Sequence, residues 1–125
     1  MEQPTGIWRC YRYQGKRPTD AEARDNTVAV PPLQTVQWLK KPTSMRLLST
    51  THLDEVELWL AEQSDTYGPR LLNGTEEDIL RMKEAVGYAM QRIKIGKPVV
   101  WGHWLTGGIY LALAIIPDWG TDGRN

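Results

Sequence analysis

The stretch KPVVWGHWLTGGIYLALAIIPDWG, from Lys97 to Gly120, decides which fold this chain can adopt. Residues 99–116 contain no Asp, Glu, Lys or Arg, so they reach the lower length limit of a membrane-spanning helix. His103 and Thr106 interrupt this run, and its β-branched and aromatic residues favour strands. The pair Gly107-Gly108 divides it, as in a β-hairpin. We therefore predict a C-terminal β-hairpin over about residues 99–116 and no transmembrane segment.

A turn centred on the two glycines also predicts the register of the hairpin. Leu105 would lie opposite Tyr110, and His103 would lie opposite Ala112. Both faces would then be largely apolar, as expected for a central hairpin that the helices cover. A single strand broken by a glycine bulge is the alternative.

Two helices are predicted before the hairpin. The clearer one, at about residues 76–95, has Thr75 as its N-cap and three acidic residues in its first turn. Gly96 is suited to the left-handed position after its last turn. The other helix, at about 52–66, is expected to be capped by Thr51 and to end before Gly68-Pro69.

The N-terminal half is predicted to supply the other strands. Residues 5–13 alternate polar and aromatic side chains, and short strands are also expected at 27–30, 33–39 and 45–49. The predicted fold is α+β: a mainly antiparallel sheet with two helices packed on it and a C-terminal hairpin. Residues 1–125 would form a single domain, with 120–125 as a flexible tail.

Composition excludes several classes of protein. Hydrophobic residues make up 41% of the chain and charged residues 24%, which are globular rather than disordered values. Cys10 is the only cysteine, so no disulfide framework is present. The first ten residues contain no long apolar run of the kind found in signal peptides, which predicts a cytoplasmic location.

The stretch WRCYRYQGKR, residues 8–17, interleaves cations with aromatic rings. Arginine can bind phosphate in a bidentate manner, and aromatic rings stack on bases. We expect an anionic partner, with nucleic acid ranking slightly ahead of an anionic membrane surface. An ordinary charged edge strand is the alternative. The predicted contact residues are Arg9, Tyr11, Arg12, Tyr13, Lys16 and Arg17.

Protein–protein recognition is the second functional hypothesis. Trp38, Trp59 and Trp119 are candidate interface anchors, because tryptophan is enriched at binding hot spots. The net charge is zero, but residues 47–84 hold three cations against nine acids. The first predicted helix could complement the basic N-terminal strand of a second subunit through its acids Asp54, Glu55, Glu57, Glu62 and Asp65. A small viral or accessory protein acting by inhibition or by self-assembly would have these properties.

The segment RLLSTTHLDEVELWLAEQSDTYG, residues 46–68, and the order of elements around it resemble the globular part of rhabdovirus matrix proteins. The resemblance is one of layout and implies self-assembly. Pro31-Pro32-Leu33-Gln34 departs from the PPxY motif of that family, so no functional residue is transferred.

An enzyme is the third hypothesis, with His103 or Cys10 as the reacting group. The sequence contains no GxSxG motif, and its one cysteine and two histidines lack the spacing of a zinc site. We therefore predict a non-catalytic binding or assembly protein, with no catalytic residue, metal or cofactor.

Overall fold

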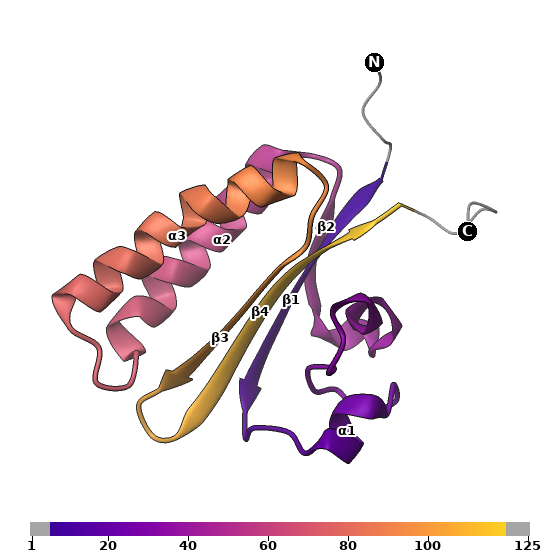
Figure 1. Ribbon diagram of the computed structural model, residues 1–125, viewed down its shortest axis with the longest axis horizontal. Coiled ribbons are helices and arrows are strands. Elements are labelled where there is room, and N and C mark those ends of the chain that lie inside the picture. Colours follow the sequence, from indigo (N-terminus) through magenta and orange to yellow (C-terminus); the bar gives the residue numbers. More distant parts are fainter. Residues whose placement is uncertain (1–5, 120–125) are drawn as a thin grey trace.

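The structure is a computed structural model that describes residues 6–119. Four antiparallel strands form one sheet in the order β2-β1-β4-β3, with two long helices packed on it (Figure 1). This arrangement confirms the predicted α+β fold and its C-terminal hairpin. The elements are β1 (Ile7–Gly15), β2 (Arg46–Thr50), α2 (Leu53–Tyr67), α3 (Glu76–Lys94), β3 (Val99–Leu105) and β4 (Ile109–Asp118).

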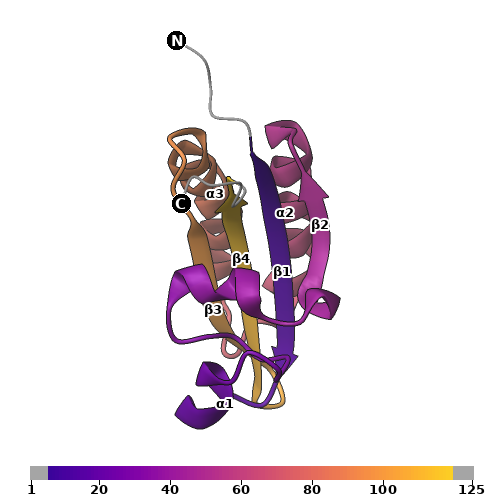
Figure 2. The same cartoon turned by 90° about the vertical axis from the view of Figure 1, so that its right-hand side faces the viewer.

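The two faces of the sheet are covered differently. Figure 2 shows α2 and α3 behind the sheet and the segment between β1 and β2 in front of it. This front segment contains the short helix α1 (Asp20–Arg24) and two 3-10 helices, η1 (Thr35–Lys40) and η2 (Thr43–Met45). Trp38 and Met45 from this segment pack in a second apolar cluster against the sheet.

Two of the predicted N-terminal strands were wrong. Residues 27–30 form turns and bends, and most of 33–39 belongs to η1 rather than to a strand. The alternation of residues 33–39 is short enough to fit either a strand or a 3-10 helix. The 3-10 helix places the Trp38 ring on the sheet, where it is 1% exposed. The strand expected at 45–49 is present as β2.

Strand β1 lies in the centre of the sheet, because it pairs with a strand from the far end of the chain. Its pairing with β4 runs from Ile7 opposite Asp118 to Gly15 opposite Tyr110. The β4 residues 111–116 are all buried, as expected for a strand covered on both faces. The edges of the sheet are therefore β2 and β3.

The predicted hairpin register was wrong by one residue. Leu105 lies opposite Ile109 and His103 opposite Leu111, across a three-residue loop in which Gly107 and Gly108 have φ of 86° and 74°. The hairpin is not central either, because β3 is an edge strand. A slip of one residue exchanges the faces of a strand, so Trp101 and His103 face the helices.

The ends of the helices test the predicted caps. Thr75 and Asp78 form a reciprocal capping box at the start of α3, as predicted. Helix α2 begins after His52 instead of Thr51. The hydroxyl of Thr50 accepts a hydrogen bond from the His52 backbone N–H at 3.0 Å, so the polar side chain at this end comes from the end of β2. The predicted tail at 120–125 lies outside the described residues.

Candidate functional site

The basic and aromatic residues of β1 do not share one surface. Side chains alternate along a strand, so Arg9 and Arg12 point to opposite faces of the sheet. The Arg9 guanidinium contacts the Asp118 carboxylate at 3.1 Å. Arg12 lies on the helix side, where it donates to Gln63 Oε1 at 3.0 Å and covers the Tyr67 ring. The prediction of a single contact surface was therefore wrong.

The tyrosines of this stretch are held within the fold. Tyr11 is fully buried beside Trp38, and its hydroxyl accepts a hydrogen bond from Arg46 Nε at 2.9 Å. Burial raises the pKa of Tyr11 above its usual value. Tyr13 donates its hydroxyl to the Lys16 carbonyl at 2.6 Å. Tyr11 cannot contact a partner, because β1 is a central strand with packed layers on both sides.

Lys16 and Arg17 are the remaining members of the predicted contact set. Both are exposed in the turn after β1. The acidic residues Asp20 and Glu22 follow in α1, so the local surface carries charges of both signs. These two cations remain available to a partner, and the half-buried Tyr13 ring, whose hydroxyl donates to the Lys16 carbonyl, lies beside them.

The predicted interface tryptophans also belong mainly to the interior. Trp38 is 1% exposed in the cluster on the sheet face opposite α2 and α3, and Trp59, on the inner side of α2, is 8% exposed. Neither ring is exposed on the surface as an interface anchor would be, because each fills a gap between the sheet and a covering layer. Trp119 is half-buried and packs edge-to-face against Trp8, with ring centroids 5.5 Å apart.

The two candidate reacting groups lie on different strands. Cys10 is fully buried in β1, and burial raises its pKa to about 12, so the thiol stays protonated at neutral pH. His103 is half-buried in β3, where burial lowers its pKa. Strand β4 lies between them. Across residues 6–119, no group of three His, Cys, Asp or Glu side chains could hold a metal ion.

The outer edge of β3 is only partly occupied. The Leu72 N–H donates to the Trp104 carbonyl at 2.9 Å, and the Thr106 N–H donates to the Arg70 carbonyl at 2.8 Å. These bonds form an isolated bridge at the hairpin end of β3. The chain then turns away from the edge at Asn73, which has a left-handed φ of 54°. Asparagine tolerates this conformation better than most residues.

The two bonds also fix the direction of the other backbone groups of β3. In an antiparallel strand, the N–H and C=O of one residue point to the same side, and successive residues alternate. Because Trp104 and Thr106 bond outward, the groups of Val100 and Gly102 point outward too. Within the described part of the chain, no strand pairs with β3 on this side beyond Trp104.

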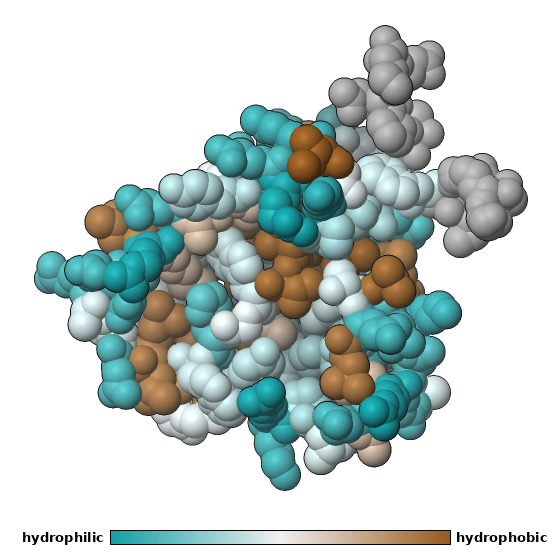
Figure 3. Space-filling view, in the orientation of Figure 1, coloured by the Kyte–Doolittle hydropathy of each residue, from teal (hydrophilic) through white to brown (hydrophobic). Residues whose placement is uncertain are grey.

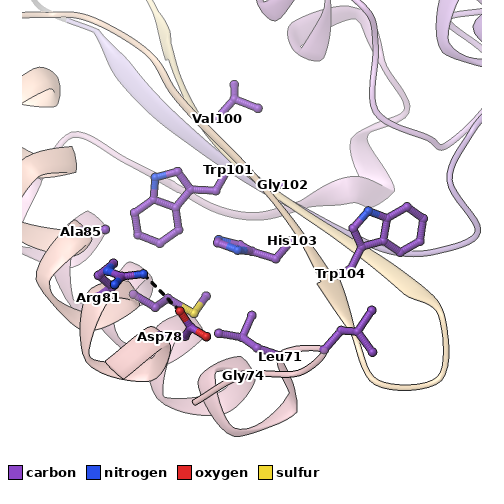
Figure 4. Close-up of a pocket in the computed structure, with 12 residues that line it drawn as sticks. Leu71, Gly74, Asp78, Arg81, Ala85, Val100, Trp101, Gly102, His103 and Trp104 are labelled. Carbon is purple, nitrogen blue, oxygen red and sulfur yellow. Dashed lines mark hydrogen bonds and ion pairs between the residues drawn. The ribbon is translucent and has the colours of Figure 1, made fainter. Parts of the chain in front are cut away.

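A groove of about 710 Å³ lies between this edge, α3 and the loop before α3. Figure 4 shows Trp101 and His103 pointing toward α3, while Trp104 points to the opposite side of the strand. Met82 and Ala85 of α3 supply apolar lining. Figure 3 shows apolar surface in this region, where the hairpin and the loop before α3 lie.

Charge in the groove is nearly balanced. Asp78 and Arg81 are its charged lining residues, and Arg81 forms ion pairs with Asp78 and with Glu77. The strand itself, VVWGHWL, carries no charged residue. The edge and its groove therefore combine apolar side chains with outward backbone donors and acceptors, a site that the sequence analysis did not identify.

No family model, curated protein or solved structure matches this chain. No helix in residues 6–119 combines the length and apolar character needed to cross a membrane. The candidate site is therefore defined by the chain's own geometry.

Proposed function

We propose that this protein is a non-catalytic protein-binding domain, and that it takes an extended segment of another protein as an added strand beside β3. The observation that supports the proposal is the open edge at Val100 and Gly102. Each of these residues directs one N–H and one C=O away from the sheet. An incoming strand can satisfy all four groups, and strand addition of this kind is a common mode of peptide recognition.

A comparison of the two sheet edges supports this choice. Natural edges are usually blunted by short length, charge, proline or a bulge. Strand β2 has only five residues, includes Arg46, and meets β1 across a register shift between Cys10 and Tyr11. Strand β3 has seven residues and none of these devices. It also leaves Val100 47% exposed and Trp104 42% exposed.

A single strand fits this edge better than a second copy of the chain does. An added strand needs only about 4.8 Å of space beside β3. A second copy placed edge to edge would bring its own α3 and its own loop before α3 into the same groove. The segment at Leu72 already occupies the edge opposite Trp104, which shortens the stretch that two copies could share.

An anionic partner has less support. Of the six residues expected to contact it, Tyr11 is buried, and Arg9 and Arg12 are bonded on opposite faces. The chain has zero net charge, whereas nucleic-acid-binding domains usually carry an excess of cations. Binding through Lys16 and Arg17 would weaken steeply as salt increases, whereas backbone pairing at β3 would depend little on salt.

The test uses a phage-displayed library of random twelve-residue peptides, selected on the wild-type protein. Val100→Pro removes one outward N–H without touching the bonds between β3 and β4, and Val100→Ala is the matched control that keeps it. Val100→Pro should bind the selected peptides about tenfold more weakly, or worse, because one backbone hydrogen bond is lost and the proline ring obstructs the added strand. Val100→Ala should change their affinity by less than about threefold. Equal binding to all three proteins would refute the proposal.

A further inference from the structure

Resting on the proposed function, we infer that the groove beside β3 selects one side chain of the added strand, a bulky apolar residue placed opposite Trp101. Strand addition alone accepts almost any sequence, because it uses backbone groups. The groove adds a requirement on a single position of the ligand. Which ligand residue enters the groove depends on the face of the sheet that each ligand side chain occupies.

The hydrogen-bond pattern fixes these faces. All pairs in this sheet are antiparallel, and an antiparallel ligand would exchange backbone bonds opposite Val100 and Gly102. Side chains of directly opposed residues point to the same face. The ligand residue opposite Trp101 therefore points toward the helices, between α3 and the strand. Figure 4 shows Trp101 directed to this side.

The groove offers apolar surface to that side chain. Met82 is buried, Trp101 and Leu71 are half-buried, and Ala85 has a small side chain that leaves room between α3 and β3. The volume of about 710 Å³ lies within the range of ligand-binding pockets, so an aromatic side chain can be accommodated.

A charged ligand side chain would find no suitable partner there. Arg81 is already paired with Glu77 and Asp78, and Asp78 also accepts the Thr75 backbone N–H in the capping box. The His103 ring packs in a T-shaped arrangement with Trp101, with ring centroids 6.1 Å apart, so an aromatic contact already engages it. Because a buried charge without a partner is costly, Asp or Lys at this ligand position should be rejected.

The ligand residues on either side of this position face the other side of the sheet, where they meet the aromatic side chains of Tyr110 and Trp104. A Cβ added to Gly102 would come 2.3 Å from the Tyr110 hydroxyl oxygen, so the Tyr110 side chain covers this glycine. Trp104 packs edge-to-face with Tyr110 at 5.3 Å. The ligand residue opposite Gly102 would therefore rest on aromatic surface, which suits β-branched residues.

The experiment takes one selected peptide and varies only its groove residue. Wild-type protein should bind the Phe or Leu form about tenfold more tightly than the Ala form, and the Asp and Lys forms more weakly still. Ala85→Trp should fill the groove and reduce the Phe-to-Ala ratio to less than about threefold. Glu84→Trp, at an exposed neighbouring position, is the control that should leave the ratio unchanged. Ala85→Leu serves as a milder filler if Ala85→Trp does not fold.

Amide protection separates the two proposals. If the peptides protect the Val100 and Gly102 amides but the Ala form binds as well as the Phe form, the groove inference is wrong and strand addition stands. If no selected peptide protects these amides, both are wrong. If the amides become protected only as the protein concentration rises, with a dimer in sedimentation equilibrium, a second copy is the occupant and the inference fails.

Discussion

Replacing Lys41 with methionine tests how the segment between β1 and β2 is held on the sheet face opposite α2 and α3. Lys41 follows η1 and is 2% exposed. Its Nζ donates to the backbone carbonyls of Glu22 at 3.1 Å, Asp25 at 2.7 Å and Val28 at 3.2 Å. One ammonium group thus joins α1 and the turn after it to η1, whose Trp38 covers the sheet.

The expected loss follows from these three bonds. A hydrogen bond to a charged group contributes about 1.5–3 kcal/mol, and methionine keeps the apolar stem while removing every donor. The carbonyls belong to exposed or half-buried residues, so water can replace part of the loss. We expect Lys41→Met to lower the free energy of unfolding by about 2–4 kcal/mol, and Tm by roughly 8–15 °C for a domain of this size.

Urea denaturation followed by tryptophan fluorescence measures this loss. Lys40→Met is the matched control, because Lys40 is the exposed last residue of η1, next to Lys41, and its replacement should change stability by less than about 0.5 kcal/mol. Burial lowers the pKa of Lys41, so the unfolded chain holds that proton more tightly. Wild-type stability should therefore rise relative to Lys41→Met as pH approaches 10.5 from below. Equal stability of Lys41→Met and wild type would refute the role of this lysine.

Three further predictions concern single residues. Thr75→Ala removes the capping box of α3 and should cost about 1 kcal/mol by urea denaturation. Gly87→Ala should add about 0.4–1 kcal/mol, because this exposed helical position leaves a Cβ free of contacts within 4 Å. The Cys10 thiol should react with a disulfide reagent at pH 8 only when the protein unfolds. Burial raises the pKa of Cys10 to about 12, so above pH 9 the thiol ionises in the unfolded chain before it does so in the folded one. The free energy of unfolding of the wild type should therefore fall above pH 9 relative to that of Cys10→Ala, by up to about 1.4 kcal/mol per pH unit.

Local sequence signals predicted the elements that have regularly spaced apolar residues or clear capping residues. Helix α3 could be predicted because Thr75, the acids after it and Gly96 mark both of its ends. The hairpin could be predicted from its two glycines. Its register could not, because a three-residue loop and a two-residue turn carry similar residues and differ by one position in pairing.

Strand order could not be predicted, because it depends on contacts between distant parts of the chain. Strand β1 becomes central only through β4, about 100 residues away. This pairing buries Tyr11 and separates Arg9 from Arg12, which together were expected to form the working surface. The alternation that places the two arginines on opposite faces was visible in the sequence and should have counted against a single surface.

The open edge of β3 had a weaker sequence signal. Strand β4 reads as a nearly continuous apolar run, whereas β3 contains glycine and histidine among its tryptophans, a difference typical of central and edge strands. The Asn73-Gly74 pair before α3 indicates a turn, but the sequence alone does not show that this turn carries the chain away from the edge of a sheet.

Hydrogen exchange of the β3 amides in dilute protein tests the open edge most directly. The amides of Trp101 and His103 bond to β4 and should exchange slowly, whereas those of Val100 and Gly102 point outward and should exchange at least about a hundredfold faster. An alternating pattern of this kind, with the fast amides becoming slow when a selected peptide binds, is the result that we predict. Uniform slow exchange from Val99 to Leu105 in the free monomer would mean that the edge is already covered and would contradict the proposed function.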